Sequence, residues 1–103
     1  FHLVVSSMTL HHVPDTTELL RTLSDLVLPG GILAVADLDS EDGSFHSDNT
    51  GVVHFGFDRV RLKSLFEKAG FRDVRGTTAA TVVREQEGGV ARKFPVFLIT
   101  GKK

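Results

Sequence analysis

Histidine and carboxylate side chains are the groups of this 103-residue chain best suited to chemistry, because it contains no cysteine. His46 and His54 share one stretch with four acidic residues, Asp39, Glu41, Asp42 and Asp48. Imidazole and carboxylate groups together are possible metal ligands. However, the chain has no H-x-x-x-H or H-E-x-x-H pattern and no cysteine pair. A solvated polar loop or a substrate lid is therefore favoured, and a histidine-dependent metal-binding domain is the weaker alternative.

Two apolar runs each end in polar residues. The chain passes from the first run, residues 1–5, to Ser6, Ser7 and Met8. The second run, residues 32–36, ends at Asp37. Ligands of open parallel sheets bind beyond the carboxyl ends of the strands, so these residues are candidate ligand contacts if both runs are strands. The alternative for the serines is a strand-ending turn in which their hydroxyls cap backbone groups.

Two adjacent histidines, His11 and His12, lie just before a predicted helix. Adjacent residues rarely point the same way, so at most one of the two is expected to face a site. Taken by themselves, both are more readily explained as hydrogen-bonded or solvated histidines than as catalytic groups.

Local signals place these candidates on a strand–helix–strand unit. Asp15, with Glu18 three residues later, is typical of a helix N-terminus, and apolar residues continue at helical spacing to Val27. The Pro-Gly-Gly turn at residues 29–31 ends this helix. The strand expected at residues 32–36 is apolar on both faces, as a central parallel strand is.

The second half of the chain predicts a long loop, a helix and a hairpin. Residues 37–57 are acidic and turn-rich, and Asp58 is the expected N-cap of a helix that ends before Gly70. A β-favouring stretch, a hairpin connection and a last strand follow, at residues 71–84, 85–93 and 95–100. The expected class is α/β: two parallel strands with a crossover helix, then a helix and an antiparallel hairpin.

Charge and hydropathy exclude several classes of partner. The net charge is −1, so the chain lacks the excess of basic residues that is typical of a nucleic-acid binder. The basic residues of the second helix and the strand after it interleave with apolar ones, as on a solvated helix face; they are Arg59, Arg61, Lys63, Lys68, Arg72 and Arg75. No apolar run is long enough to span a membrane, and no signal peptide is evident. The expected location is the cytoplasm.

Three blocks carry a resemblance to a known family: FHLVVSSMTLHHVPD, LLRTLSDLVLPGGILAVADLD and GFDRVRLKSLFEKAGFRDV. In their order and spacing they resemble the C-terminal half of class I S-adenosylmethionine-dependent methyltransferases, whose Rossmann-like sheet the chain would complete. The nearest branch is the small-molecule enzymes of ubiquinone-biosynthesis type. The resemblance implies that the first block is the fourth strand of the family and that the Pro-Gly-Gly block precedes the fifth.

Two features depart from the family pattern. His2 stands where the family usually has an acidic residue. The glycine-rich turn of the first strand is absent, and Gly30-Gly31 does not replace it because that pair follows a helix and precedes a strand. The chain also opens on Phe1, inside a strand. The expectation is a single partial domain, residues 1–103, whose cofactor-binding N-terminal half lies upstream.

The resemblance implies methyl transfer from S-adenosylmethionine to a small-molecule acceptor in the full-length parent, with the isolated chain inactive. Ser6, Ser7 and Met8 would lie beside the methionine part of the cofactor. The implied acceptor contacts are His11, His12, Asp37, His46 and His54. In a substrate lid at residues 37–57, the expected hinges are Gly43, Gly51 and Gly56, and the expected inward contacts include Phe45 and Phe55.

A rival interpretation is a stand-alone α/β interaction or dimerisation module that binds no cofactor. The family topology would place the first strand beside the missing half, which leaves Leu3, Val4 and Val5 as an apolar edge. A homodimer through residues 1–6, about a two-fold axis, is therefore expected.

Overall fold

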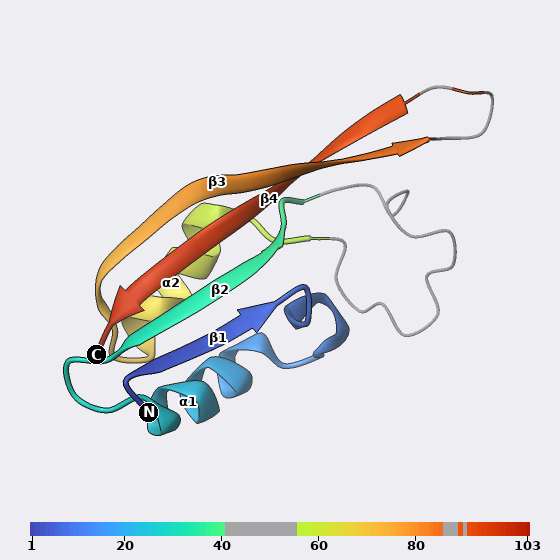
Figure 1. The fold of residues 1–103 in the computed structure, drawn as a ribbon. Coiled ribbons are helices and arrows are strands. Elements are labelled where there is room, and N and C mark those ends of the chain that lie inside the picture. The colour runs from blue at the N-terminus through green and yellow to red at the C-terminus, as the bar shows by residue number, and fades with distance from the viewer. Residues whose placement is uncertain (41–55, 86–88, 90) are drawn as a thin grey trace.

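The computed structural model describes residues 1–40, 56–85, 89 and 91–103. The elements are, in chain order, β1 (Leu3–Ser7), the 3₁₀ turn η1 (Leu10–His12), α1 (Thr16–Leu26), β2 (Ile32–Leu38), α2 (Arg59–Lys68), β3 (Arg72–Glu85) and β4 (Ala91–Lys102). The strands form one sheet in the order β1-β2-β4-β3 (Figure 1). β1 and β2 are parallel, whereas β4 is antiparallel to both of its neighbours. The expected α/β architecture, with a crossover helix and a final hairpin, is confirmed.

Both helices begin at the aspartates that the sequence marks. The Asp15 carboxylate accepts a hydrogen bond from the Glu18 N–H at 3.0 Å, and the Asp58 carboxylate accepts one from Val60 at 2.9 Å. Each carboxylate thereby satisfies a backbone donor that the first turn of a helix leaves without an intrahelical partner. Gly70, with φ of +101°, ends α2 in the left-handed conformation that favours glycine.

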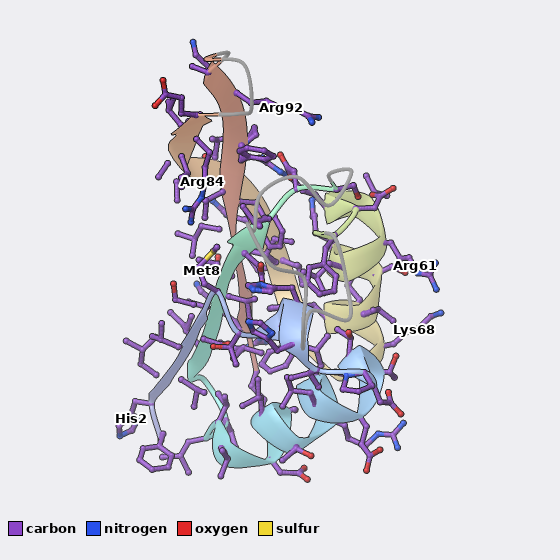
Figure 2. The ribbon with its side chains drawn as sticks, turned by 90° about the vertical axis from the view of Figure 1, so that its right-hand side faces the viewer. His2, Met8, Arg61, Lys68, Arg84 and Arg92 are labelled. Atoms are coloured by element: carbon purple, nitrogen blue, oxygen red, sulfur yellow. The ribbon has the colours of Figure 1, made fainter. Side chains whose placement is uncertain are left out.

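The main core lies between the two helices and one face of the sheet. Figure 2 views the sheet close to edge-on and shows α1 and α2 on the same side of it. Leu20 of α1, Phe66 of α2 and Phe97 of β4 are completely buried in this layer. On the opposite face, Leu38, Phe94 and Val96 form a smaller buried cluster toward the carboxyl end of β2.

The hairpin is longer than the sequence suggests. β3 continues to Glu85 and β4 already begins at Ala91, so the expected connection over residues 85–93 and the expected start of the last strand at 95 are wrong. Pro95 lies where the pairing of β4 with β2 ends: its carbonyl accepts a hydrogen bond from the Asp39 N–H at 3.1 Å, and the last β2 residue paired is Leu38, with Val96. The hairpin consequently extends past the other elements (Figure 1).

The end of β2 and the start of α2 are joined by backbone pairing. Asp39 and Phe57 form an isolated parallel bridge, and the Phe57 N–H donates to the Leu38 carbonyl at 2.9 Å. Gly56 has φ of +77°, and a Cβ there would lie 1.9 Å from the Asp39 carbonyl oxygen. Only glycine allows this approach. Residues 41–55 lie outside the described ranges.

In the described parts of the chain, no helix is both long and apolar enough to cross a bilayer.

Gly101 tests how tightly the core is packed. A Cβ at Gly101 would lie 2.9 Å from the Phe71 Cβ and 3.0 Å from the Phe66 ring. We expect Gly101→Ala to lower the free energy of unfolding by about 1–3 kcal/mol, because the rings must shift to admit the methyl group. The measurement is urea unfolding followed by circular dichroism. Gly76→Ala is the matched control, since its added carbon would meet its nearest neighbour at 3.5 Å. Equal stabilities of the two variants would contradict the tight packing.

Candidate functional site

The turn after β1 is bonded to the end of β2. Ser7 pairs with Ala36, and the Met8 N–H donates to the Ala36 carbonyl at 2.8 Å. Met8 adopts φ of +55°, a conformation uncommon for a non-glycine residue, so the chain reverses sharply at this point. The Met8 side chain is half-buried against the small cluster that contains Leu38. Ser6, Ser7 and Met8 therefore lie at the carboxyl end of β1, where the sequence places a ligand.

A buried hydrogen-bonded pair links the next part of this turn to β2. His11 Nδ1 lies 2.8 Å from Asp37 Oδ1, and the His11 backbone N–H donates to Asp37 Oδ2 at 3.2 Å. The Leu38 N–H donates to Asp37 Oδ1 at 2.8 Å. Asp37 is completely buried and His11 is 2% exposed. The carboxyl group is hydrogen-bonded on both oxygens, as a polar group removed from water must be.

The two adjacent histidines lie in different environments. His11 is turned inward to Asp37, whereas His12 is exposed. Their rings remain close, with centroids 4.2 Å apart. The hydrogen bonds of Asp37 to His11 and Leu38 stay within the chain. His46 and His54 lie outside the described ranges, as do Gly43, Phe45, Gly51 and Phe55.

Arg59 is a structural residue of this region that the sequence does not identify. Its guanidinium binds Asp39 through Nε at 2.6 Å and through a terminal nitrogen at 2.8 Å. The same terminal nitrogen donates to Thr78 of β3 at 3.0 Å, and the guanidinium lies over the Phe97 ring, 5.9 Å from its centroid. Arg59 thus joins α2 to the end of β2 and to the middle of β3. The expectation of a solvated basic face is wrong at this position.

Electrostatics agree with this arrangement. The hydrogen bonds to Asp39 raise the pKa of Arg59 above its ordinary value; partial burial opposes the rise, and the negative charge of Asp39 supports it. The sequence does not predict that Arg59 pairs with Asp39, because Asp39 lies 20 residues away in the chain and the intervening loop shows no periodicity.

A cavity of about 470 Å³ opens between the N-terminal ends of α1 and α2. Its walls combine hydroxyl, apolar and charged groups, from Pro14, Thr16, Thr17, Ser40, Gly56, Phe57, Asp58, Arg61, Leu62 and Leu65. Of the residues that the sequence assigns to cofactor or acceptor, none of those within the described ranges lines it. In the described part of the chain, no cluster of three histidine, aspartate or glutamate side chains is arranged to hold a metal ion.

Removing the Arg59 guanidinium should loosen the junction of α2 with the sheet. We expect Arg59→Met to lower the free energy of unfolding by about 1 kcal/mol, the magnitude of a bidentate but partly exposed ion pair. Arg61→Met is the control, because Arg61 lies on the same helix and points away from the core (Figure 2). Chemical denaturation of both variants measures the difference, and a loss that is the same in both would show that the pair with Asp39 contributes nothing specific.

Residues 1–75 match the sequence model of a family described as a methyltransferase domain. A curated relative, an uncharacterized methyltransferase of Schizosaccharomyces pombe, is 38% identical over 92 residues. The match covers 80% of this chain and 32% of the relative, so the chain spans about a third of that protein's length.

Solved structures share the fold. Phosphoethanolamine N-methyltransferase 2 of Haemonchus contortus, in complex with S-adenosyl-L-methionine, matches with a TM-score of 0.71 at 11% identity; the match covers 100% of this chain and 33% of that one. A SAM-dependent methyltransferase of Thermotoga maritima matches with a TM-score of 0.67 at 20% identity, over 100% of this chain and 56% of that one. These similarities confirm a Rossmann-like fold.

Proposed function

Because the chain belongs to the methyltransferase-domain family, we propose that it acts in methyl transfer from S-adenosylmethionine to a small-molecule acceptor. The observation that carries this proposal is the family match over residues 1–75, which contain every described candidate at the carboxyl ends of β1 and β2. The relatives are longer than this chain. We therefore assign the activity to a full-length protein in which this chain supplies the acceptor side and part of the cofactor side. The ubiquinone-biosynthesis branch stays a prediction that rests on the three sequence blocks.

The turn after β1 is chemically suited to the cofactor. Ser7 is exposed there, and Met8 offers an apolar side chain at the same edge of the sheet. When bound, S-adenosylmethionine supplies a methyl carbon, and the bond from the acceptor to this carbon forms while the carbon–sulfur bond breaks. The contribution of Ser6, Ser7 and Met8 is to hold the donor in place, because orientation is the main service that a protein provides to a displacement of this kind.

His12 is the residue that we assign to the acceptor. Its exposed imidazole lies five residues after Ser7, on the same turn. An imidazole can donate a hydrogen bond that orients the acceptor, or take up its proton where the acceptor atom must lose one. His11 is bound to Asp37 and is assigned no direct contact.

Calorimetry and a labelled methyl group test this proposal. We expect the full-length protein to bind S-adenosylmethionine saturably. It should also transfer a tritiated methyl group to a small molecule present in a cell extract. The isolated chain of residues 1–103 should show no saturable heat, since most of the cofactor contacts would come from the rest of the domain.

Substitution of His12 completes the test. His12→Ala should lower transfer about 100-fold where a proton must be removed. His2→Ala is the control, because His2 and Met8 lie at opposite ends of β1 (Figure 2). Saturable binding by the isolated chain, or a full-length protein that labels no small molecule, would contradict the proposal.

A second candidate function, an interaction or dimerisation module, is favoured by the exposed edge of the sheet. Leu3 and Val5 are 58% and 64% exposed, and in the described ranges no strand pairs with the outer edge of β1. Such an edge can add a strand from another chain. We propose that the isolated chain forms a homodimer through residues 1–6, with two copies of β1 paired about a two-fold axis.

Light scattering measures this association. We expect a dimer for the isolated chain and a monomer for Val5→Lys, because a charge at the edge opposes strand addition. Val83→Lys on β3 is the matched control, since Val83 is comparably exposed, at 59%, but lies on the other edge of the sheet. A wild-type chain that remains monomeric at high concentration would overturn the dimer.

A further inference from the structure

The buried pair of Asp37 and His11 is not used by the methyl transfer described above. Among the described residues, these two are the titratable side chains that are almost fully buried. They lie 26 residues apart in the chain and join the segment before α1 to the end of β2. A buried polar pair of this kind is weak evidence for stability, because apolar side chains of similar volume often stabilise a fold as well or better. The pair can instead fix the orientation of the groups that it joins, since each oxygen of the carboxylate accepts a hydrogen bond from a defined donor.

We propose that Asp37 and His11 are positioning residues that hold η1 so that His12 is presented to the acceptor. This inference rests on the function proposed above. Asp37 binds His11 twice, through the backbone N–H and through the ring. The backbone of η1 and the orientation of the His11 ring are therefore set by the same carboxylate. His12, the next residue, has its ring centroid 4.2 Å from that of His11, so the direction of one ring limits the directions open to the other.

The hydrogen bonds to Asp37 are additional to those of the cofactor turn, to which the His12 N–H is also bound through the Thr9 carbonyl at 3.0 Å. Met8 is held by its own hydrogen bond to the Ala36 carbonyl, at 2.8 Å. Thr9 is held by a hydrogen bond from its hydroxyl to the Ser7 carbonyl, at 3.0 Å. Loss of the pair of Asp37 and His11 should therefore disturb His12 and leave Met8 in place. In an enzyme, loss of the pair should therefore lower the rate of methyl transfer without lowering the affinity for the cofactor.

Two substitutions of His11 distinguish positioning from filling space. His11→Asn keeps an N–H donor close to the position of Nδ1 and can still bind Asp37. His11→Leu keeps a bulky side chain but removes the donor, which leaves Asp37 buried with one partner fewer. Ser24→Ala is the matched control: Ser24 is 5% exposed, and its hydroxyl donates to the Ala69 carbonyl at 3.2 Å, away from this turn.

The first measurement needs no methyl transfer. The full-length protein and its variants are treated with diethylpyrocarbonate, and the modification rate of His12 is followed by mass spectrometry. We expect His11→Leu to change this rate by about threefold or more, the effect of a shift of about 0.7 kcal/mol between ring orientations. His11→Asn and Ser24→Ala should keep the wild-type rate. A folded His11→Leu variant with the wild-type rate would overturn the proposal. If that variant does not fold, His11→Asn decides: an unchanged His12 rate supports positioning, and a rate changed by more than about threefold overturns it.

The second measurement connects the pair to activity. We expect His11→Leu to lower transfer of the tritiated methyl group at least about tenfold, since small misplacements of a reacting group are costly. Affinity for S-adenosylhomocysteine, measured by calorimetry, should remain within about twofold, a difference below 0.5 kcal/mol. His11→Asn should restore transfer. Equal losses of transfer and of affinity would assign the pair a general structural role instead. A protein that transfers no methyl group while its His12 rate responds as expected would refute the proposed function and leave the positioning intact.

Discussion

Strand β2 is hydrogen-bonded to β1 along one edge and to β4 along the other, so that Val35 lies between Ser6 and Ile99 in the sheet. Its helix-facing side chains Leu33 and Val35 are completely buried in the main core. Several elements are placed directly with respect to this strand: β4 by pairing, β1 and α1 through the crossover, and α2 through the pairing of Phe57 with the end of β2. A shift of one residue in its register would turn the buried side chains to the opposite face, which makes this register the constraint on which the site depends.

The same face of β2 that builds the core ends in two carboxylates. Side chains alternate along a strand, so Asp37 and Asp39 continue the row of Leu33 and Val35 toward the helix side. Asp37 binds His11, from the segment between β1 and α1, and Asp39 binds Arg59, at the start of α2. Two carboxyl groups, two residues apart on β2 and just beyond it, thus hold the segment before α1 and the start of α2, which come from different parts of the chain. This places the exposed His12 and the turn of Met8 at one edge of the sheet.

The relatives of this chain are longer than the chain itself. The chain belongs to the methyltransferase-domain family but spans about a third of its Schizosaccharomyces pombe relative. In the described residues both helices cover one face of the sheet (Figure 2). Leu3 and Val5 of the edge strand β1 are largely exposed. The proposed methyl transfer and the proposed association of the isolated chain both follow from this asymmetry. In the first, the rest of a domain meets this surface; in the second, another copy of the chain does.

Local signals in the sequence determined where the helices and turns lie. Asp15 and Asp58 cap helices as expected, and Gly70 ends α2, because capping and left-handed turns depend on residues within one turn of each other. The apolar run before Asp37 likewise identified a buried central strand. Only the tertiary structure decided which histidine is buried, that Asp37 is bound by His11, and that Arg59 is bound by Asp39. These partners lie 26 and 20 residues apart, and nothing in their own neighbourhoods indicates that they meet. They meet because the register of β2 sets both carboxylates on the face that the helices cover.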